Sequence, residues 1–209
     1  MPGLPAPGEA AVMTTTASVP ETPSPGTYRI DEERCLITVR TRHLFGLGAV
    51  RGTFRLRSGE IRVAEQVQDS AVRAAVDAES FHTGNPARDR TVRSARLLDT
   101  AGHPVFTFTS TEVTESGGRW VVRGRLVVRD AEHPVELAIE QARADGPQLT
   151  IVASAGIDRY AFGVTAMKGL AARRLSCQLE IVAVQKEVAV QKVAVQKEEA
   201  RSDHDSHRG

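Results

Sequence analysis

The chain has few aromatic side chains, few cysteines and no excess charge of either sign. Aromatic residues make up 4% of its 209 residues, and 27 basic against 26 acidic residues leave a formal net charge of +1. Nucleic acids are recognised by basic surfaces with stacking aromatics, so this composition argues against a nucleic-acid partner. Cys35 and Cys177 form no CxxC motif or disulfide framework, and we expect two buried, reduced thiols.

Long apolar runs are also missing. No stretch reaches the roughly 20 residues that a membrane helix needs, so we predict no integral membrane segment. The N-terminus has neither the basic segment nor the apolar stretch of a secretory signal, and we predict a cytoplasmic location. Residues 1–25 are rich in Pro, Ala, Thr and Ser without a period, which predicts a disordered extension. Whether the natural start is Met1 or Met13 stays open.

Apolar and polar residues alternate over most of residues 26–184. In 50–57, for example, apolar residues and Gly52 occupy the even positions, and Arg and Thr occupy the odd ones. Ser58-Gly59 is interpreted as a turn before the pattern resumes. Strict alternation between turn signals predicts antiparallel strands with one buried face, about eight in number. The predicted fold is therefore an all-β, eight-stranded antiparallel barrel, which has no exposed edges and can enclose one small ligand.

One segment, at about 86–98, has helical character instead. Asn85 is a good N-cap, Pro86 suits the first turn, and Val92 and Leu98 fall on one face. This predicts a short helix inserted beside one end of the barrel.

The interior of the barrel has two interpretations. Small residues on the apolar faces would leave room for a slender guest: Ala74, Gly124, Ala153 and Ala155. Alternatively, four aromatic residues fill the space: Phe54, Phe106, Phe108 and Trp120. The sequence leaves both open.

Motifs for catalysis or metal binding are lacking. There is no Gly-x-Ser-x-Gly elbow and no zinc-binding histidine pair, although His43, His82 and His103 could meet at one mouth of the barrel. The pentapeptide VAVQK recurs at 182–186, 188–192 and 193–197, which marks residues 185–209 as a low-complexity tail. We predict no catalytic residue, no metal and no cofactor.

A series of short motifs, in this order and with this spacing, is specific enough to indicate a protein family. They are Tyr28-Arg-Ile-Asp, Arg42-His43, Gly52-Thr-Phe, Phe81-x-Thr-Gly-Asn-Pro, Arg88-Asp-Arg with Arg93-Ser94, His103-Pro104 before Phe106-x-Phe-x-Ser, Gly124-x-Leu and Arg159-Tyr-Ala-Phe-Gly. Over roughly residues 26–184 the chain resembles the YceI-like family, the lipid- or polyisoprenoid-binding domain. The resemblance implies a lipocalin-like barrel without catalytic activity, whose apolar pore holds a long isoprenoid such as a polyprenyl phosphate or a quinone tail.

The chain departs from the family pattern at several polar positions. Arg34-Cys35 stands where the family often has His-Ser, Thr91 where it often has His, and Arg96 where an acidic residue is frequent. A shared polar site near the helix is therefore not implied.

The predicted function is non-catalytic carriage or sequestration of a long apolar lipid. The predicted lipid-binding residues are Ile37, Val39, Phe54, Val72, Val76, Phe106, Phe108, Leu126, Leu137, Ile151 and Leu179. The candidates for binding a head group are Arg42, His43, Arg88 and Arg93, since arginine binds phosphate bidentately. The alternative for the helix arginines is a solvated face, with Asp89 paired to Arg93.

The predicted partner is thus an isoprenoid or another long-chain apolar ligand, and a homodimer is compatible with the sequence. Two other functions stay open. One is an enzyme that acts on an apolar substrate through rim His and Arg residues. The other is a stress-related interaction module that recruits a partner through the VAVQK tail.

Overall fold

The structure is a computed structural model that describes residues 23–43, 48–168 and 171–186. Most of the predicted N-terminal extension and of the VAVQK tail lies outside the described residues. Nine strands and three short helices make up the described part. Their bounds are β1 (Gly26–Ile30), η1 (Glu32–Arg34), β2 (Leu36–His43), β3 (Gly48–Val63), η2 (Val67–Asp69), β4 (Ala71–His82), α1 (Pro86–Arg93), β5 (Val105–Ser116), β6 (Arg119–Val128), β7 (Ala131–Asp145), β8 (Gln148–Asp158) and β9 (Arg174–Gln185).

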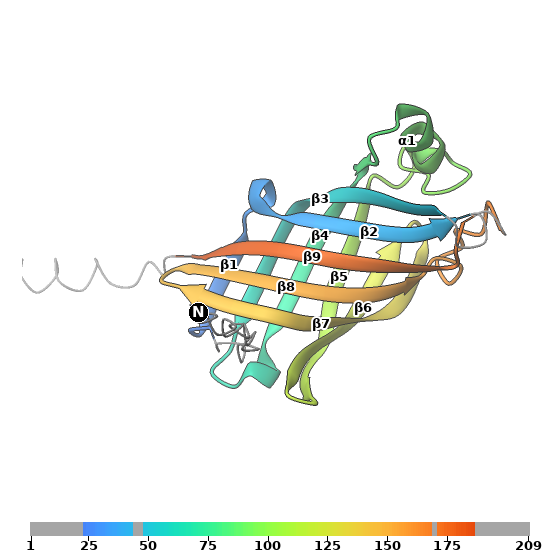
Figure 1. The fold of residues 1–209 in the computed structure, drawn as a ribbon. Helices are drawn as coiled ribbons and strands as arrows, with labels where there is room; N and C mark the ends of the chain where they lie inside the picture. The colour runs from blue at the N-terminus through green and yellow to red at the C-terminus, as the bar shows by residue number, and fades with distance from the viewer. Residues whose placement is uncertain (1–22, 44–47, 169–170, 187–209) are drawn as a thin grey trace, which may run out of the picture.

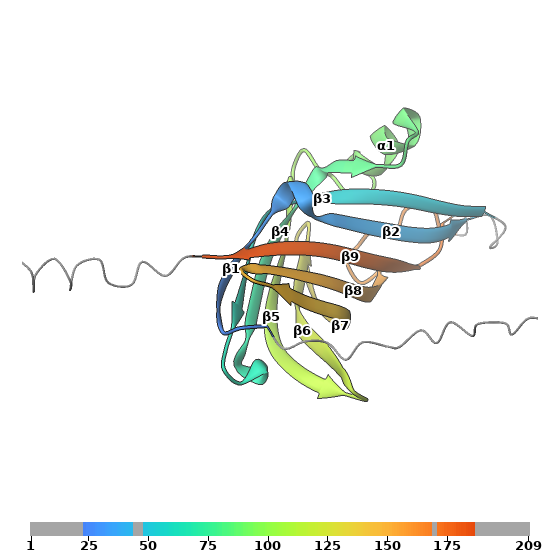
Figure 2. The same ribbon diagram turned by 60° about the vertical axis from the view of Figure 1, so that its left-hand side comes forward.

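The strands form one antiparallel sheet that closes on itself (Figures 1 and 2). Neighbours follow the order β3-β2-β9-β8-β7-β6-β5-β4, and a further pairing of β3 with β4 completes the ring. The short β1 lies between β3 and β9, as β2 does further along, so the two strands share one position. The prediction of an eight-stranded antiparallel barrel is confirmed.

The turn predicted at Ser58-Gly59 is wrong, because β3 runs through it without a break. Leu56 pairs with Val76 on β4 while Ser58 pairs with Ala75, so β3 has one extra residue there. Such a bulge shifts the alternation by one residue and bends the strand. Even-numbered residues of β3 face inward before the bulge, and odd-numbered residues face inward after it. In the sequence, this change of alternation looks like a turn between two strands.

Helix α1 begins where the sequence predicted and ends earlier. The Asn85 side chain accepts hydrogen bonds from the backbone N–H groups of Ala87 and Arg88, which confirms the N-cap. Ser94 has an extended backbone with ψ 161°, so the helix ends at Arg93 rather than at residue 98. The following residues form turns that return the chain to β5, and α1 lies beyond the ends of β4 and β5 (Figure 1).

Aromatic rings fill part of the interior. The Phe54 ring lies 5.0 Å from the Phe81 ring and 6.0 Å from the Phe106 ring, measured between centroids. The Phe108 ring lies directly over Gly124, so the missing side chain of this glycine makes room for Phe108 and not for a guest. Aromatic rings therefore occupy part of the barrel interior, and the space that remains is described below.

We predict that Gly124→Ala destabilises the barrel. The new Cβ would lie 2.5 Å from the carbonyl oxygen of Thr109 and against the Phe108 ring, so that part of the wall must shift. Overpacking of this kind costs about 1–3 kcal/mol of unfolding free energy. Gly156→Ala is the matched control, because no heavy atom would lie within 4 Å of its Cβ. Urea unfolding of the two variants measures the difference, and equal midpoints would contradict the prediction.

Candidate functional site

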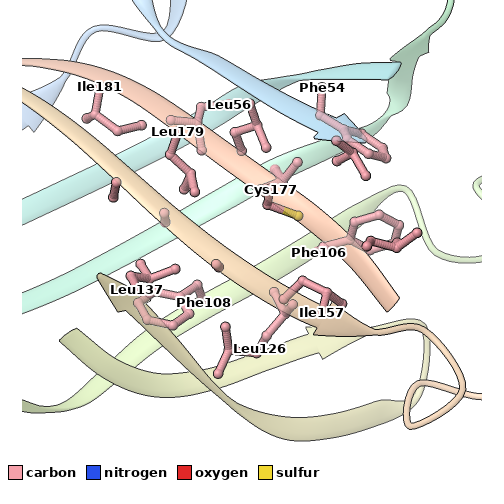
Figure 3. A pocket seen from close by; sticks show the side chains of 18 of the residues that line it. Phe54, Leu56, Phe106, Phe108, Leu126, Leu137, Ile157, Cys177, Leu179 and Ile181 are labelled. Carbon is pink, nitrogen blue, oxygen red and sulfur yellow. The ribbon is translucent and has the colours of Figure 1, made fainter. Parts of the chain in front are cut away.

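The barrel encloses an apolar cavity of about 710 Å³. All nine strands contribute side chains to its wall, and Figure 3 shows Leu56, Phe106, Leu137 and Leu179 converging on it from different strands. Since side chains alternate along a strand, one face of each strand supplies the wall and the other meets solvent.

Every residue predicted to contact a lipid lies in this wall. They are Ile37, Val39, Phe54, Val72, Val76, Phe106, Phe108, Leu126, Leu137, Ile151 and Leu179. Ala74, Ala153 and Ala155 line the cavity as well, so small side chains and aromatic rings share the interior. The cavity is the space that this mixture leaves open, and contact with a lipid stays a prediction.

The sequence reasoning missed another group of wall residues, most of them outside the regular strands. Leu97 and Leu98 follow α1, whereas Phe162, Val164 and Met167 come from the β8–β9 connection. Connections carry no alternation, so no period in the sequence marks these residues as facing inward. The only usable signal was the motif Arg159-Tyr-Ala-Phe-Gly.

The two ends of the barrel differ. The connections β2–β3, β4–β5, β6–β7 and β8–β9 all meet at one end, which we call the helix end because the β4–β5 connection carries α1. Leu97 from that connection belongs to one buried cluster with Phe162 and Val164 from the β8–β9 connection. These two connections therefore pack together over the helix end of the cavity.

Arg159 organises the β8–β9 connection. Its side chain is 7% exposed and lines the cavity. Its guanidinium donates to the carbonyl oxygens of Ala172 at 2.9 Å, Val164 at 2.5 Å, Ala166 at 2.8 Å and Ala171 at 3.1 Å. These bonds tie separate turns of the connection to one side chain. Burial lowers the pKa of Arg159, yet an arginine in a protein stays charged.

The four residues predicted to bind a head group lie in different parts of the structure. Arg88 on α1 lines the cavity, and Arg88 and Arg159 are the charged residues in the described part of its wall. Arg93 instead donates to the carbonyl oxygen of Phe81 and holds α1 to β4. Arg42 and His43 end β2 at the helix end, where they pair with Ala49 and Gly48, and their side chains lie outside what the structure describes.

Asp89 is the buried anion of the α1 region. It accepts hydrogen bonds from the Thr83 backbone N–H at 3.0 Å and the Thr83 hydroxyl at 2.6 Å, and His82 Nδ1 lies 3.2 Å away. The Thr83 hydroxyl is the main cause that lowers the pKa of Asp89. Within the described residues Asp89 makes no ion pair with Arg93, so the alternative prediction of that pair is wrong.

Histidine and carboxylate groups lie outside the cavity wall. His103 Nε2 lies 3.6 Å from both Asp99 and Asp130, and His82 faces Asp89. No histidine, aspartate or glutamate lines the cavity in the described part of the chain. The same residues contain no group of three potential metal ligands.

Both cysteines are free. Cys177 lines the cavity and pairs with Val39, whereas Cys35 lies near Val182, whose N–H is 3.1 Å from its Sγ. Cys35 lies four residues before Val39, the partner of Cys177, so the two cysteines are roughly 13 Å apart at strand spacing, which excludes a disulfide. Burial raises the pKa of Cys177 to about 11.

A family profile described as the YceI-like domain matches residues 28–195. The chain belongs to the YceI-like family. Protein YceI of Escherichia coli O157:H7 is 33% identical to this YceI-like chain over 113 residues, which are 53% of the chain and 59% of that relative. A UPF0312 protein of Pectobacterium atrosepticum is 32% identical over 113 residues, 53% of the chain and 58% of the relative. The match thus spans less than two thirds of these relatives.

Solved structures share the barrel fold. BcnA of Burkholderia cenocepacia superimposes with a TM-score of 0.67 at 18% identity, over 74% of this YceI-like chain and 99% of BcnA. A polyisoprenoid binding domain from Saccharophagus degradans superimposes with a TM-score of 0.60 at 14% identity, over 78% and 100% of the two chains. No helix among the described residues is long and apolar enough to span a membrane.

We predict that Asp89→Asn destabilises the protein in a pH-dependent way. Since folding lowers the pKa of Asp89 below its ordinary 3.8, its contribution is fully present above pH 3.8 and disappears as the pH falls through the folded-state value. The variant should unfold at lower urea concentration than the wild type at pH 7, with a smaller gap at pH 3. Asp145→Asn at the opposite end is the control. A gap that is unchanged at low pH would refute this role of Asp89.

Proposed function

We propose that the protein binds and carries a long apolar lipid in the barrel cavity without chemically changing it. An isoprenoid is the class of lipid to test first. One observation carries the proposal: a closed barrel surrounds about 710 Å³ of space with an apolar wall, and its charged wall residues, Arg88 and Arg159, belong to connections at one end. A wall of this kind accepts an apolar chain along its length and a polar group at its helix end.

The volume of the cavity limits the size of the ligand. At the roughly 30 Å³ that a water-sized group occupies in a condensed phase, a cavity of about 710 Å³ holds roughly two dozen non-hydrogen atoms. A chain of about four isoprene units therefore fits inside, and a longer polyprenyl chain would extend beyond the cavity. At about 0.3 kcal/mol per atom, such a ligand would bind with about 7 kcal/mol, a Kd on the order of 10 µM.

The non-catalytic part of the proposal rests on the composition of the wall. General acid–base chemistry needs a titratable group within hydrogen-bond reach of the substrate. In the described residues the three histidine–carboxylate pairs made by His82 and His103 lie outside the cavity wall. The isoprenoid class is supported by the family and by the polyisoprenoid binding domain with the same fold. The cytoplasmic location and a homodimer stay predictions.

We predict that Ala155→Phe removes most lipid binding while the barrel stays folded. Ala155 lines the cavity, and a phenyl ring there occupies space that the ligand needs. The matched control is Gly156→Phe, because its neighbour Gly156 points to open space on the outer face of β8. Native mass spectrometry after expression counts the bound lipid, and circular dichroism checks the fold. A wild-type protein without extractable lipid that also fails to bind added geranylgeraniol would refute the proposed function.

We predict that Arg88→Gln weakens binding of anionic ligands selectively. Arg88 is the cavity-lining arginine whose guanidinium is not committed to backbone carbonyls in the described residues. A charge-assisted hydrogen bond at a partly exposed site is worth about 1.5 kcal/mol, or roughly tenfold in Kd. Titration with geranylgeranyl phosphate should show this loss, and titration with geranylgeraniol should not. Arg90→Gln on the same helix is the control, and an equal loss for both ligands would exclude a head-group role.

A further inference from the structure

Basic residues gather at the helix end of the barrel. The described residues of the connections at this end, 83–104, 129–130, 159–168 and 171–173, contain eight basic and three acidic residues, a net charge of +5 in a chain whose total is +1. At the opposite end, the connections 64–70, 117–118 and 146–147 contain two acidic residues and no basic one. The connections at the two ends of the barrel therefore differ strongly in charge.

Among the described residues, the three acidic residues of these connections form no salt bridge with the arginines there, and of those arginines Arg173 pairs with Asp158 at the end of β8. Asp89 is bound by Thr83 and faces His82, while Asp99 and Asp130 both face His103. Four exposed basic residues of this end have no carboxylate within salt-bridge distance in the described part of the chain. They are Arg88, Arg90, Arg96 and Lys168. Their positive charge is available to a partner.

An apolar feature lies among these charges. Met167 lines the cavity and is at the same time 39% exposed, so it marks the rim where the cavity wall reaches the surface. Lys168 follows it directly. The cavity mouth thus combines an apolar rim with a basic surround. Nucleic acid would match the charge alone, whereas the surface of an anionic bilayer matches both features.

We infer that the helix end of the barrel is a docking surface for an anionic lipid bilayer, which brings the cavity mouth against the membrane. The purpose of docking rests on the proposed function, because a long apolar ligand is held in membranes and passes poorly through water. Arg88, Arg90, Arg96 and Lys168 provide attraction to anionic head groups, and the chain needs no membrane-spanning helix for this. Salt weakens the docking, since the charges are exposed.

Flotation with lipid vesicles tests the inference on the full chain. The wild type should bind vesicles of phosphatidylcholine with phosphatidylglycerol and bind vesicles of phosphatidylcholine alone weakly. Each basic residue near an anionic surface is worth about fivefold in partitioning, so Arg90→Gln combined with Arg96→Gln should lower binding roughly 25-fold. Neither residue lines the cavity, so the double variant should keep its lipid load in native mass spectrometry.

A matched control removes the same charge elsewhere. Arg119 and Arg143 are exposed and lie at or near the opposite end of the barrel, so Arg119→Gln combined with Arg143→Gln should leave vesicle binding unchanged. Equal losses in both double variants would indicate a net-charge effect and overturn the docking surface. Binding of duplex DNA, but not of vesicles, through Arg90 and Arg96 would also overturn it.

The outcomes separate docking from lipid carriage. A wild-type protein that carries lipid but shows no preference for anionic vesicles refutes the docking surface and leaves the proposed function intact. A protein that binds anionic vesicles through Arg90 and Arg96 but never carries lipid refutes the proposed function and leaves the docking surface intact.

Discussion

The pairing of β3 with β4 is the interaction on which the rest of the structure depends, because it closes the sheet into a barrel. Closure gives every strand two neighbours, so backbone donors and acceptors are satisfied without an exposed edge. It also separates an inner face from an outer face. The bulge between Leu56 and Ser58 lets the long β3 bend around this ring while its apolar residues keep facing inward.

A barrel with an unfilled interior gives up part of its own stability. Side chains around an open space lose packing contacts that a filled core would have. Phe108 over Gly124 shows that this barrel packs closely where the sequence permits it. Ala153 and Ala155, by contrast, line the cavity with small side chains. A bound chain would restore the missing contacts, and its binding free energy would then add to the stability of the fold.

The two ends of the barrel differ in the connections that join the strands. At one end, two of the three connections are two-residue turns that contain glycine, whereas the long connections at the other end carry α1, Arg159 and the four exposed basic residues without a salt bridge in the described part of the chain. Arg159 and Asp89 are the two buried charges that shape these connections, each through hydrogen bonds to neighbouring backbone or hydroxyl groups. The mouth, the charged wall residues and the basic surface therefore lie together.

The sequence by itself determined the strand character, the closed antiparallel class, the N-cap at Asn85 and the inward face of residues such as Leu137 and Leu179. These follow from a period of two and from local capping, which nearby residues decide. Tertiary structure alone decided the bulge in β3, the early end of α1, the partners of Asp89 and the place of Arg159 and Met167 at the mouth. Those features depend on contacts between segments far apart in the chain, and no local period records which connections meet at the end of a closed barrel.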